Sequence, residues 1–126
     1  MIIGTGTDLT EVARVAQVLA RFGDRFKRRV FTPREISYCE SKINANERFA
    51  ARFAAKEAAM KAIGTGLRHG VSWQDVEVGR EPGGRPTIHF TGKAAEFAAK
   101  LGGRRVHLSL THTAEHAFAV VILESE

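Results

Sequence analysis

The feature that most constrains the fold of this chain is the stretch from Asn46 to Ile63, which is rich in alanine, glutamate, lysine and arginine. These residues are among the strongest helix formers. Gly64-Thr65-Gly66 follows, and glycine is common just beyond a helix C-terminus. The stretch predicts one long helix, around which the rest of a chain of 126 residues must pack. That length is enough for one compact domain, residues 1–126, and too short for two well-packed ones.

Shorter patterns predict the remaining elements. Thr32-Pro33-Arg34-Glu35 is typical of a helix start, with Thr as N-cap, Pro at the first helical position and Glu three residues after the cap. Further helices are predicted over 10–22, 25–31, 32–42 and 92–101. Strands are predicted over 2–8, 76–78, 87–90, 106–111 and 117–123. The predicted class is α+β, an antiparallel sheet covered on one face by helices that include one long central helix.

Several functional classes find no support in the sequence. No apolar run approaches the roughly 20 residues that a membrane helix needs. The N-terminus lacks the basic flank and long apolar stretch of a signal peptide. Cys39 is the only cysteine, so no disulfide can form within the chain. We therefore expect a cytoplasmic protein with no membrane partner.

The formal net charge of +5 favours a polyanionic partner, and part of that charge is concentrated early in the chain. Basic residues outnumber acidic ones between Glu11 and Arg29. Arg14, Arg21 and Arg25 lie off the apolar stripe of the predicted helix, at intervals of seven and four residues, and so share one face. This face is either a docking surface or an ordinary solvated basic surface.

An acidic residue stands out within the long helix. On a helical wheel Phe49, Phe53 and Met60 form an apolar stripe, and Glu57 lies on the same face. A carboxylate there should be partly buried, and an unpaired buried charge is costly. Glu57 therefore needs either a metal ion or a basic side chain, and the candidate bases are Lys61, Lys56 and Arg52. The pattern leaves both interpretations equally open.

Asp8 supplies a second carboxylate, directly after the small residues Gly4 to Thr7. It is either a helix N-terminal acid, which the helix dipole favours, or a partner of Glu57 in a metal site. Two carboxylates without a histidine or cysteine cluster suit Mg²⁺, which binds one or two carboxylates together with substrate phosphates and water. That Asp8 and Glu57 lie close together is a hypothesis at this point.

Two further segments offer groups for binding phosphate. In Ser109-Leu110-Thr111-His112-Thr113 the hydroxyls and His112 could bind a phosphate, or His112 could transfer protons. The alternative is an ordinary turn histidine. Backbone amides of Gly64-Thr65-Gly66 could hold a phosphate, or these residues could simply cap the helix. Neither a Walker loop nor a GxGxxG motif after the first strand is present.

Three of these segments, taken in order, resemble one known family. They are the N-terminal block Ile3 to Leu9 with Arg14, the central block Arg52-Phe53-Ala54-Ala55-Lys56-Glu57-Ala58-Ala59-Met60-Lys61, and the block Ser109 to Thr113. Together they resemble the holo-acyl-carrier-protein synthases, the short homotrimeric type of the 4′-phosphopantetheinyl transferase superfamily. The resemblance spans nearly the whole chain, and it implies the fold of that superfamily.

The resemblance implies an enzyme that transfers 4′-phosphopantetheine from coenzyme A to a serine of apo-acyl carrier protein, leaving adenosine 3′,5′-bisphosphate. Asp8 and Glu57 would hold Mg²⁺ against the coenzyme A pyrophosphate. Lys61, one helical turn beyond Glu57, would stabilise the leaving group. These three are the expected catalytic residues. The serine proton would pass either to Glu57 or to a metal-bound water.

The resemblance also implies binding surfaces. Coenzyme A would contact Lys61 and a set of residues spread along the chain, namely Arg52, Gly64, Gly66, Pro86, His112 and Thr113. The acidic carrier would dock on Arg14, Arg21 and Arg25, with Phe22 and Phe26 as apolar anchors. A homotrimer with active sites between subunits is expected. Whether the carrier serves fatty-acid or polyketide synthesis stays open, as does the tolerance for acyl-coenzyme A.

Two other functions compete with this one. A non-enzymatic basic module for nucleic acid or an acidic protein would explain the arginine-rich helix, but not Glu57 on an apolar face. Its aromatic residues, mostly Phe at core-like spacing, also lack the stacking platforms of single-strand binders. We therefore expect no nucleic-acid partner. A different Mg²⁺-dependent phosphate enzyme, such as a hydrolase, would release free phosphopantetheine instead of a modified protein.

Overall fold

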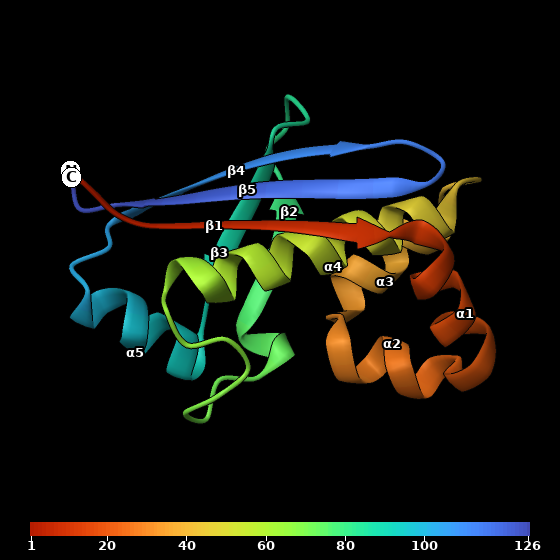
Figure 1. The fold of residues 1–126 in the computed structure, drawn as a ribbon, viewed down its shortest axis with the longest axis horizontal. Coiled ribbons are helices and arrows are strands. Elements are labelled where there is room, and N and C mark those ends of the chain that lie inside the picture. Colours follow the sequence, from red (N-terminus) through yellow and green to blue (C-terminus); the bar gives the residue numbers. More distant parts are fainter.

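The computed structural model describes residues 1–126, and its long helix α4 (Ala45–Ala62) lies along one face of a three-stranded antiparallel sheet (Figure 1). In that sheet β5 (His116–Glu124) is central and pairs with β1 (Ile2–Glu11) and with β4 (Arg105–His112). The other elements are α1 (Val12–Phe22), α2 (Asp24–Val30), α3 (Pro33–Glu40), a short 3₁₀ helix (Trp73–Asp75), β2 (Val76–Arg80), β3 (Pro86–Phe90) and α5 (Gly92–Lys100).

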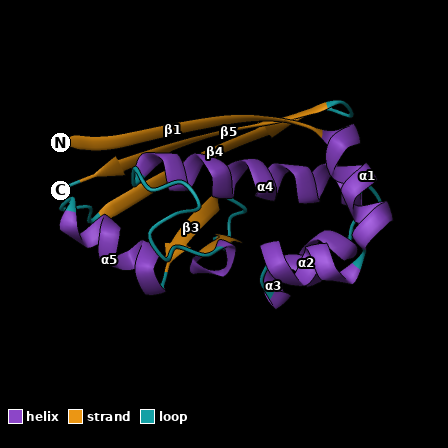
Figure 2. Ribbon diagram, turned by 60° about the horizontal axis from the view of Figure 1, so that its bottom comes forward, coloured by secondary structure: helices purple, strands orange, loops and turns teal.

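The two ends of α4 carry different groups of helices. Helices α1, α2 and α3 gather near its N-terminal end and α5 lies near its C-terminal end (Figures 1 and 2). Strands β2 and β3 form a separate two-stranded sheet, in which β2 packs on α3 and α4 while β3 approaches β4. The α+β class is confirmed, but the strands divide into two sheets where one was predicted.

Glycine allows β1 to run directly against α4. A Cβ atom on Gly6 would lie well inside van der Waals distance of the carbonyl oxygen of Ala58, and one on Gly4 would meet that of Ala62 in the same way. No other residue fits at these positions without moving the strand or the helix. The small residues ahead of Asp8 therefore serve close packing of strand on helix.

Helix α4 is buried on most of its surface. Its buried residues include Phe49, Met60 and nearly all of its alanines, and they occur on every side of the helix. The narrow apolar stripe predicted from the wheel is therefore wrong. Alanine suits the helix because neighbouring elements approach its backbone from several directions, which leaves little room for larger side chains.

A fully buried ion pair fixes α3 and β2 to α4. Lys56 Nζ lies 2.8 Å from Glu35 Oε1, both side chains are inaccessible to solvent, and Lys56 also donates to the carbonyls of Trp73 and Val76. Glu35 accepts from the amides of Thr32 and Val78, each at 2.7 Å. The predicted capping box of Thr32 and Glu35 is confirmed, and Glu35 reaches beyond it to Lys56.

Most predicted boundaries hold within about two residues, with one exception at β1. The strand continues past Asp8 to Glu11, because Thr10 and Glu11 still pair with Ala117 and His116 of β5. Helix α1 consequently begins at Val12 and not at Thr10. No helix in the structure combines the length and apolar character needed to cross a membrane.

Candidate active site

Asp8 and Glu57 line one pocket beside the middle of α4. We call it the acidic pocket; its lining residues are Asp8, Leu9, Thr10, Glu11, Arg14, Val15, Val18, Phe26, Phe53 and Glu57. The two carboxylates come from segments far apart in the sequence. The hypothesis that they lie near one another is supported by this shared lining and by the charge of Asp8 acting on Glu57.

The close packing of β1 on α4 explains why these residues meet. Gly6 lies against Ala58, and Asp8 is two residues further along the same face of the strand. Two strand residues span roughly 6.7 Å and four helix residues span roughly 6 Å. Since Gly4 meets Ala62 and Gly6 meets Ala58, β1 and α4 run in opposite directions. Asp8 is therefore placed beside the helical turn from Phe53 to Glu57.

Hydrogen bonds fix Asp8, while Glu57 forms no salt bridge. Asp8 accepts from the hydroxyl of Thr10 at 2.6 Å and lies 3.5 Å from Lys61 Nζ, which also donates to the carbonyl of Thr7. Burial raises the pKa of Glu57, the nearby charge of Asp8 raises it further, and Lys61 acts in the opposite direction.

The three basic partners considered for Glu57 are engaged elsewhere. Lys56 pairs with Glu35, and the nearest carboxylate to Lys61 is that of Asp8. Arg52 lies over the ring of Tyr38. The interpretation of Glu57 as half of a structural ion pair therefore finds no support in the structure, and the other interpretation, a metal ligand, gains weight.

The carboxylate oxygens of Asp8 and Glu57 suit a hard divalent cation, although two carboxylates alone would not complete its coordination. Both carboxylates line this one pocket, and burial together with the charge of Asp8 raises the pKa of Glu57. The structure contains no group of three or more histidine, cysteine, aspartate or glutamate side chains that could hold a metal ion. A cation bound here would take its other ligands from phosphates and water, which is the usual coordination of Mg²⁺.

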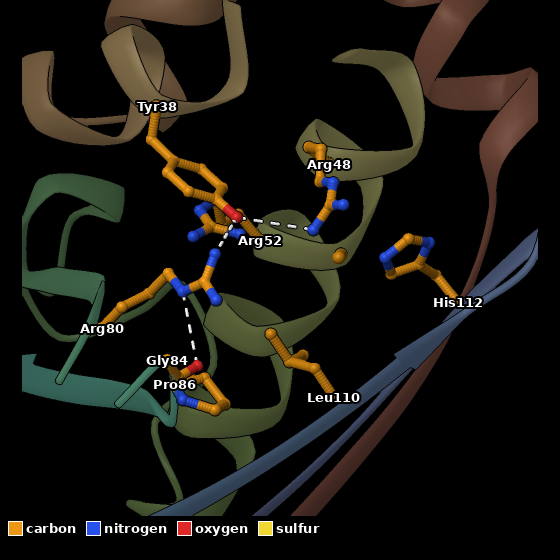
Figure 3. Close-up of a pocket in the computed structure, with 9 residues that line it drawn as sticks. Tyr38, Arg48, Arg52, Arg80, Gly84, Pro86, Leu110 and His112 are labelled. Carbon is orange, nitrogen blue, oxygen red and sulfur yellow. Dashed lines mark hydrogen bonds between the residues drawn. The ribbon is translucent and has the colours of Figure 1, made fainter. Parts of the chain in front are cut away.

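A second pocket, which we call the arginine pocket, lies between α3, α4, the β2–β3 turn and β4 (Figure 3). It brings together three of the residues expected to bind coenzyme A, Arg52, Pro86 and His112. The remaining lining residues are Tyr38, Arg48, Ala51, Arg80, Gly84 and Leu110. Three arginines and no acidic residue line the pocket, which suits a phosphate group.

His112 is held by a residue that the sequence did not single out. Its Nδ1 lies 3.0 Å from Glu47 Oε1, and both side chains are about one-quarter exposed. Glu47 is in the first turn of α4 and His112 ends β4. The pair therefore orients the imidazole at the edge of the arginine pocket.

Four expected coenzyme ligands line neither pocket, namely Lys61, Gly64, Gly66 and Thr113. Gly64 and Gly66 have φ angles of 79° and 56°, and the amide of Gly66 donates to the carbonyl of Met60, as expected for a helix C-cap. The hydroxyl of Thr113 accepts from the amides of Glu115 and His116 within the β4–β5 turn. Their contact with a coenzyme stays a prediction.

The residues expected to dock the carrier lie beside the acidic pocket. Arg14, Arg21 and Arg25 are exposed, and Arg14 also lines the pocket. They do not share the face of one helix as their spacing predicted, because Gly23 ends α1 and Arg25 lies in α2. Phe22 is 44% exposed with Arg21 lying over its ring, whereas Phe26 is half-buried and forms part of the pocket wall. An exposed basic surface with one accessible aromatic ring therefore leads into the acidic pocket.

Several residues of the two pockets escaped the sequence analysis. They are Thr10 in the acidic pocket and Tyr38, Glu47, Arg48 and Arg80 in or beside the arginine pocket. Arg48 precedes Arg52 by four residues, so their shared helix face was a usable signal. Tyr38 and Arg80 belong to other elements, and no pattern in the sequence links them to α4.

Cys39 has no part in either pocket. It is completely buried, and burial raises the pKa of its thiol to about 12, so it remains protonated and unreactive.

Comparisons with known proteins identify the family of this chain. Residues 4–121 match the family model described as ACPS, 4′-phosphopantetheinyl transferase superfamily. A holo-[acyl-carrier-protein] synthase of Koribacter versatilis is 69% identical over 98% of this chain and 99% of its own length. The holo-[acyl-carrier-protein] synthase of Solibacter usitatus is 57% identical over 99% of this chain and 100% of its own length.

Solved structures show the same fold. A holo-[acyl-carrier-protein] synthase from Neisseria meningitidis superposes with a TM-score of 0.89 at 33% identity, over 98% of this chain and 99% of that one. A holo-(acyl-carrier-protein) synthase from Bacillus anthracis, in complex with CoA (3′,5′-ADP), superposes with a TM-score of 0.82 at 36% identity. The match covers 100% of this chain and 99% of that one. From the family model and these relatives, this chain belongs to the holo-[acyl-carrier-protein] synthases of the 4′-phosphopantetheinyl transferase superfamily.

Proposed function

We propose that this protein transfers the 4′-phosphopantetheine group from coenzyme A to a serine of an apo-acyl carrier protein, as the family to which it belongs does. The observation that carries the proposal is the acidic pocket, which both Asp8 and Glu57 line, with Lys61 beside Asp8. The products would be holo-acyl carrier protein and adenosine 3′,5′-bisphosphate. The cytoplasm stays the predicted compartment.

Asp8 and Glu57 would hold Mg²⁺ in this pocket. The ion would supply Lewis acidity at the pyrophosphate and would reduce its negative charge. Thr10 orients Asp8 through its hydroxyl, and the pairing of Lys56 and Lys61 with other carboxylates supports the assignment.

The side chains of the chain itself account for the other steps. The serine oxygen attacks the β-phosphorus of coenzyme A, and the bridging bond to the α-phosphate breaks. Lys61 is half-exposed beside Asp8, so its ammonium group can follow the charge that develops on the leaving phosphate. The serine proton would pass to a water that Glu57 positions and from there to solvent, because a carboxylate that ligates Mg²⁺ is by itself a poor base.

The arginine pocket would bind the nucleotide end of coenzyme A, including its 3′-phosphate. Arg52 and His112 supply charge and hydrogen-bond donors, and Pro86 lines the opposite side. The proposal is supported by the absence of acidic lining residues. Gly64, Gly66 and Thr113 are retained as predicted ligands from the family resemblance.

The protein is further proposed to act as a homotrimer with each active site between two subunits. The acidic pocket and the arginine pocket share no lining residue and use different sides of α4. A neighbouring copy that placed its arginine pocket opposite the acidic pocket would complete a site for the whole coenzyme. Closed symmetric assemblies are common among small enzymes of this size.

Carrier docking would use the basic surface of α1 and α2. Replacing the exposed Arg21 by Glu should raise the KM for an acyl carrier protein about tenfold or more and leave the KM for coenzyme A unchanged, because like charges repel the acidic carrier. Arg104→Glu, which reverses an exposed charge outside both pockets, serves as the control. A changed KM for coenzyme A in Arg21→Glu would show that the docking surface is misplaced.

The function is tested by incubating the protein with apo-carrier, coenzyme A and Mg²⁺ and weighing the carrier by mass spectrometry. The expected result is a gain of one phosphopantetheine arm. Asp8→Ala and Glu57→Ala should each lower the rate by about a thousandfold while keeping the fold. Free phosphopantetheine with an unmodified carrier would indicate a hydrolase and overturn the proposal. Full turnover in either variant would remove the metal assignment.

A further inference from the structure

The centre of the arginine pocket is a tyrosine that no motif identifies. Tyr38, the only tyrosine of the chain, projects from α3 toward three guanidinium groups, those of Arg48, Arg52 and Arg80 (Figure 3). We propose that Tyr38 is a positioning residue that holds these three arginines together as a ready clamp for a phosphomonoester dianion. The clamp makes the enzyme select 3′-phosphorylated coenzyme A over its 3′-dephospho form. This inference rests on the proposed function of the pocket.

Tyr38 contacts each arginine in a different way. Its hydroxyl oxygen accepts hydrogen bonds from Arg80 Nη1 and from Arg48 Nη1, the latter at 3.4 Å. Its ring lies beneath Arg52, whose guanidinium carbon Cζ is 4.0 Å from the ring centroid. One side chain therefore uses both its polar end and its aromatic face to bring three cations from two other elements together.

The remaining partners of the arginines are neutral as well. Arg48 Nε donates to the side-chain oxygen of Asn44 at 3.2 Å, and Arg80 Nε donates to the carbonyl of Gly84 at 3.3 Å. None of the three arginines forms a salt bridge with a carboxylate. The nearby Glu47 is bonded to His112. The side chains are thus held in place without losing their positive charge.

This arrangement differs from an ordinary structural arginine cluster. Clustered arginines in folded proteins are usually compensated by carboxylates, because uncompensated like charges repel one another. A neutral tyrosine hydroxyl accepts hydrogen bonds without neutralising the arginines. The repulsion among the three cations therefore persists until an anion binds. A dianion with several acceptor oxygens satisfies three guanidinium groups better than a single-charged or neutral group does.

Arg52 provides an independent indication that a ligand completes the pocket. Arg52 lines the pocket and is only 4% exposed. Its Nε is buried and has no hydrogen-bond partner. Buried N–H groups are almost always paired in folded proteins. A bound phosphate that orders the guanidinium group would relieve this deficit.

The test compares coenzyme A with 3′-dephospho-coenzyme A in the wild-type enzyme and in Tyr38→Phe. The substitution removes the hydroxyl and keeps the ring under Arg52, so the fold should survive, as a thermal unfolding midpoint near that of wild type would confirm. For coenzyme A the KM should rise about tenfold with kcat unchanged, as expected for losing hydrogen bonds to charged groups. For the dephospho form, KM should be the same in both enzymes.

Two further variants sharpen the result. Arg48→Ala should also raise the KM for coenzyme A only, and combining it with Tyr38→Phe should add little, because both act through one clamp. Arg104→Ala, an exposed arginine outside the pocket, should change neither KM. Calorimetric binding of adenosine 3′,5′-bisphosphate and adenosine 5′-monophosphate to the same enzymes repeats the comparison without turnover.

The outcomes separate two kinds of failure. If wild type does not distinguish the two coenzyme forms, the nucleotide end does not bind in the arginine pocket, and the proposed function of that pocket fails. If wild type distinguishes them and Tyr38→Phe distinguishes them equally well, Tyr38 is not the positioning residue. An equal loss for both forms in Tyr38→Phe would indicate a general structural role and would also overturn the inference.

Discussion

Glu57 illustrates how a single residue can be destabilising for the fold and required by the site. Its carboxylate is half-buried, has Asp8 nearby and forms no salt bridge. Burial and the charge of Asp8 raise its pKa, so in the absence of a cation the folded state holds this proton more tightly than the unfolded chain does. The contribution of Glu57 to stability is therefore fully present at low pH and is lost as the pH rises through its raised pKa.

Glu57→Gln should accordingly make the metal-free protein more stable at neutral pH while abolishing transfer. We expect the thermal midpoint in EDTA to rise by roughly 2–4 °C at pH 7, with the difference shrinking as the pH falls through the raised pKa of Glu57 and vanishing below the usual pKa of glutamate. Thermal scans at several pH values measure this. Added Mg²⁺ should raise the midpoint of wild type and not of the variant. A variant less stable than wild type at pH 7 in EDTA would contradict the assignment.

At the scale of residues, the sequence patterns predicted which side chains line the acidic pocket better than they predicted which residues contact one another in the folded chain. The wheel placed Glu57 in a partly buried position, which is confirmed, although the apolar stripe behind that argument is wrong. Asp8 was selected for the glycines before it, and these are the residues that bring it to α4. Tyr38 and Arg80 could not be found, because their contacts depend on how α3 and the β2–β3 hairpin pack on α4.

Among the elements, β1 and α4 form the contact on which the acidic pocket depends. Their backbones touch at Gly4 and Gly6, so the distance between strand and helix is set by the absence of side chains. The positions of Asp8 and Glu57 follow from that distance. Any atom added at the contact would separate the two carboxylates as well as weaken the core.

Gly6→Ala should therefore destabilise the protein and impair catalysis together. Its methyl group would collide with the backbone oxygen of Ala58, which cannot rotate away, so we expect a loss of about 2 kcal/mol or more in the free energy of unfolding. Urea denaturation measures the loss. Gly83→Ala is the matched control, since nothing lies within 4 Å of its Cβ position, and it should stay within about 0.5 kcal/mol of wild type. Equal stability of the two variants would refute the packing argument.

Elements with strong local signals were predicted well. The capping box at Thr32 and the alanine-rich run ending at Gly64 predicted α3 and α4 closely. The end of β1 was missed because it is set by pairing with β5, more than a hundred residues away in the chain. The division into two sheets has the same origin, since strand neighbours are a property of the tertiary structure.

For the whole molecule, the separation of the two pockets is the feature with the widest consequence. The acidic pocket lies beside β1 and α1, and the arginine pocket lies between α3, β4 and the β2–β3 turn. If coenzyme A spans the acidic pocket of one copy and the arginine pocket of a neighbouring copy, as proposed, two copies of the chain contribute to each site. A variant damaged in one pocket should then be rescued by a copy damaged in the other.

Mixed assemblies of Arg52→Gln and Glu57→Gln test this prediction. Each variant alone should be nearly inactive, because every site in it lacks one group. In trimers assembled at random from equal amounts, about a quarter of the sites would pair two intact pockets, so about a quarter of the wild-type rate should return. Co-refolding followed by size-exclusion chromatography and the carrier assay measures it. Activity that stays at the level of the separate variants would show that each site lies within one chain.

Lys56 and Glu57 are adjacent in the chain yet face different surroundings: Lys56 is buried in the core against Glu35, and Glu57 lines the acidic pocket. One residue added to or removed from the middle of this helix would rotate everything beyond it by about 100°. Such a change would turn the buried cation toward solvent and the reactive carboxylate toward a new neighbour. Length variation among related sequences is therefore expected in the surface loops and not in α4.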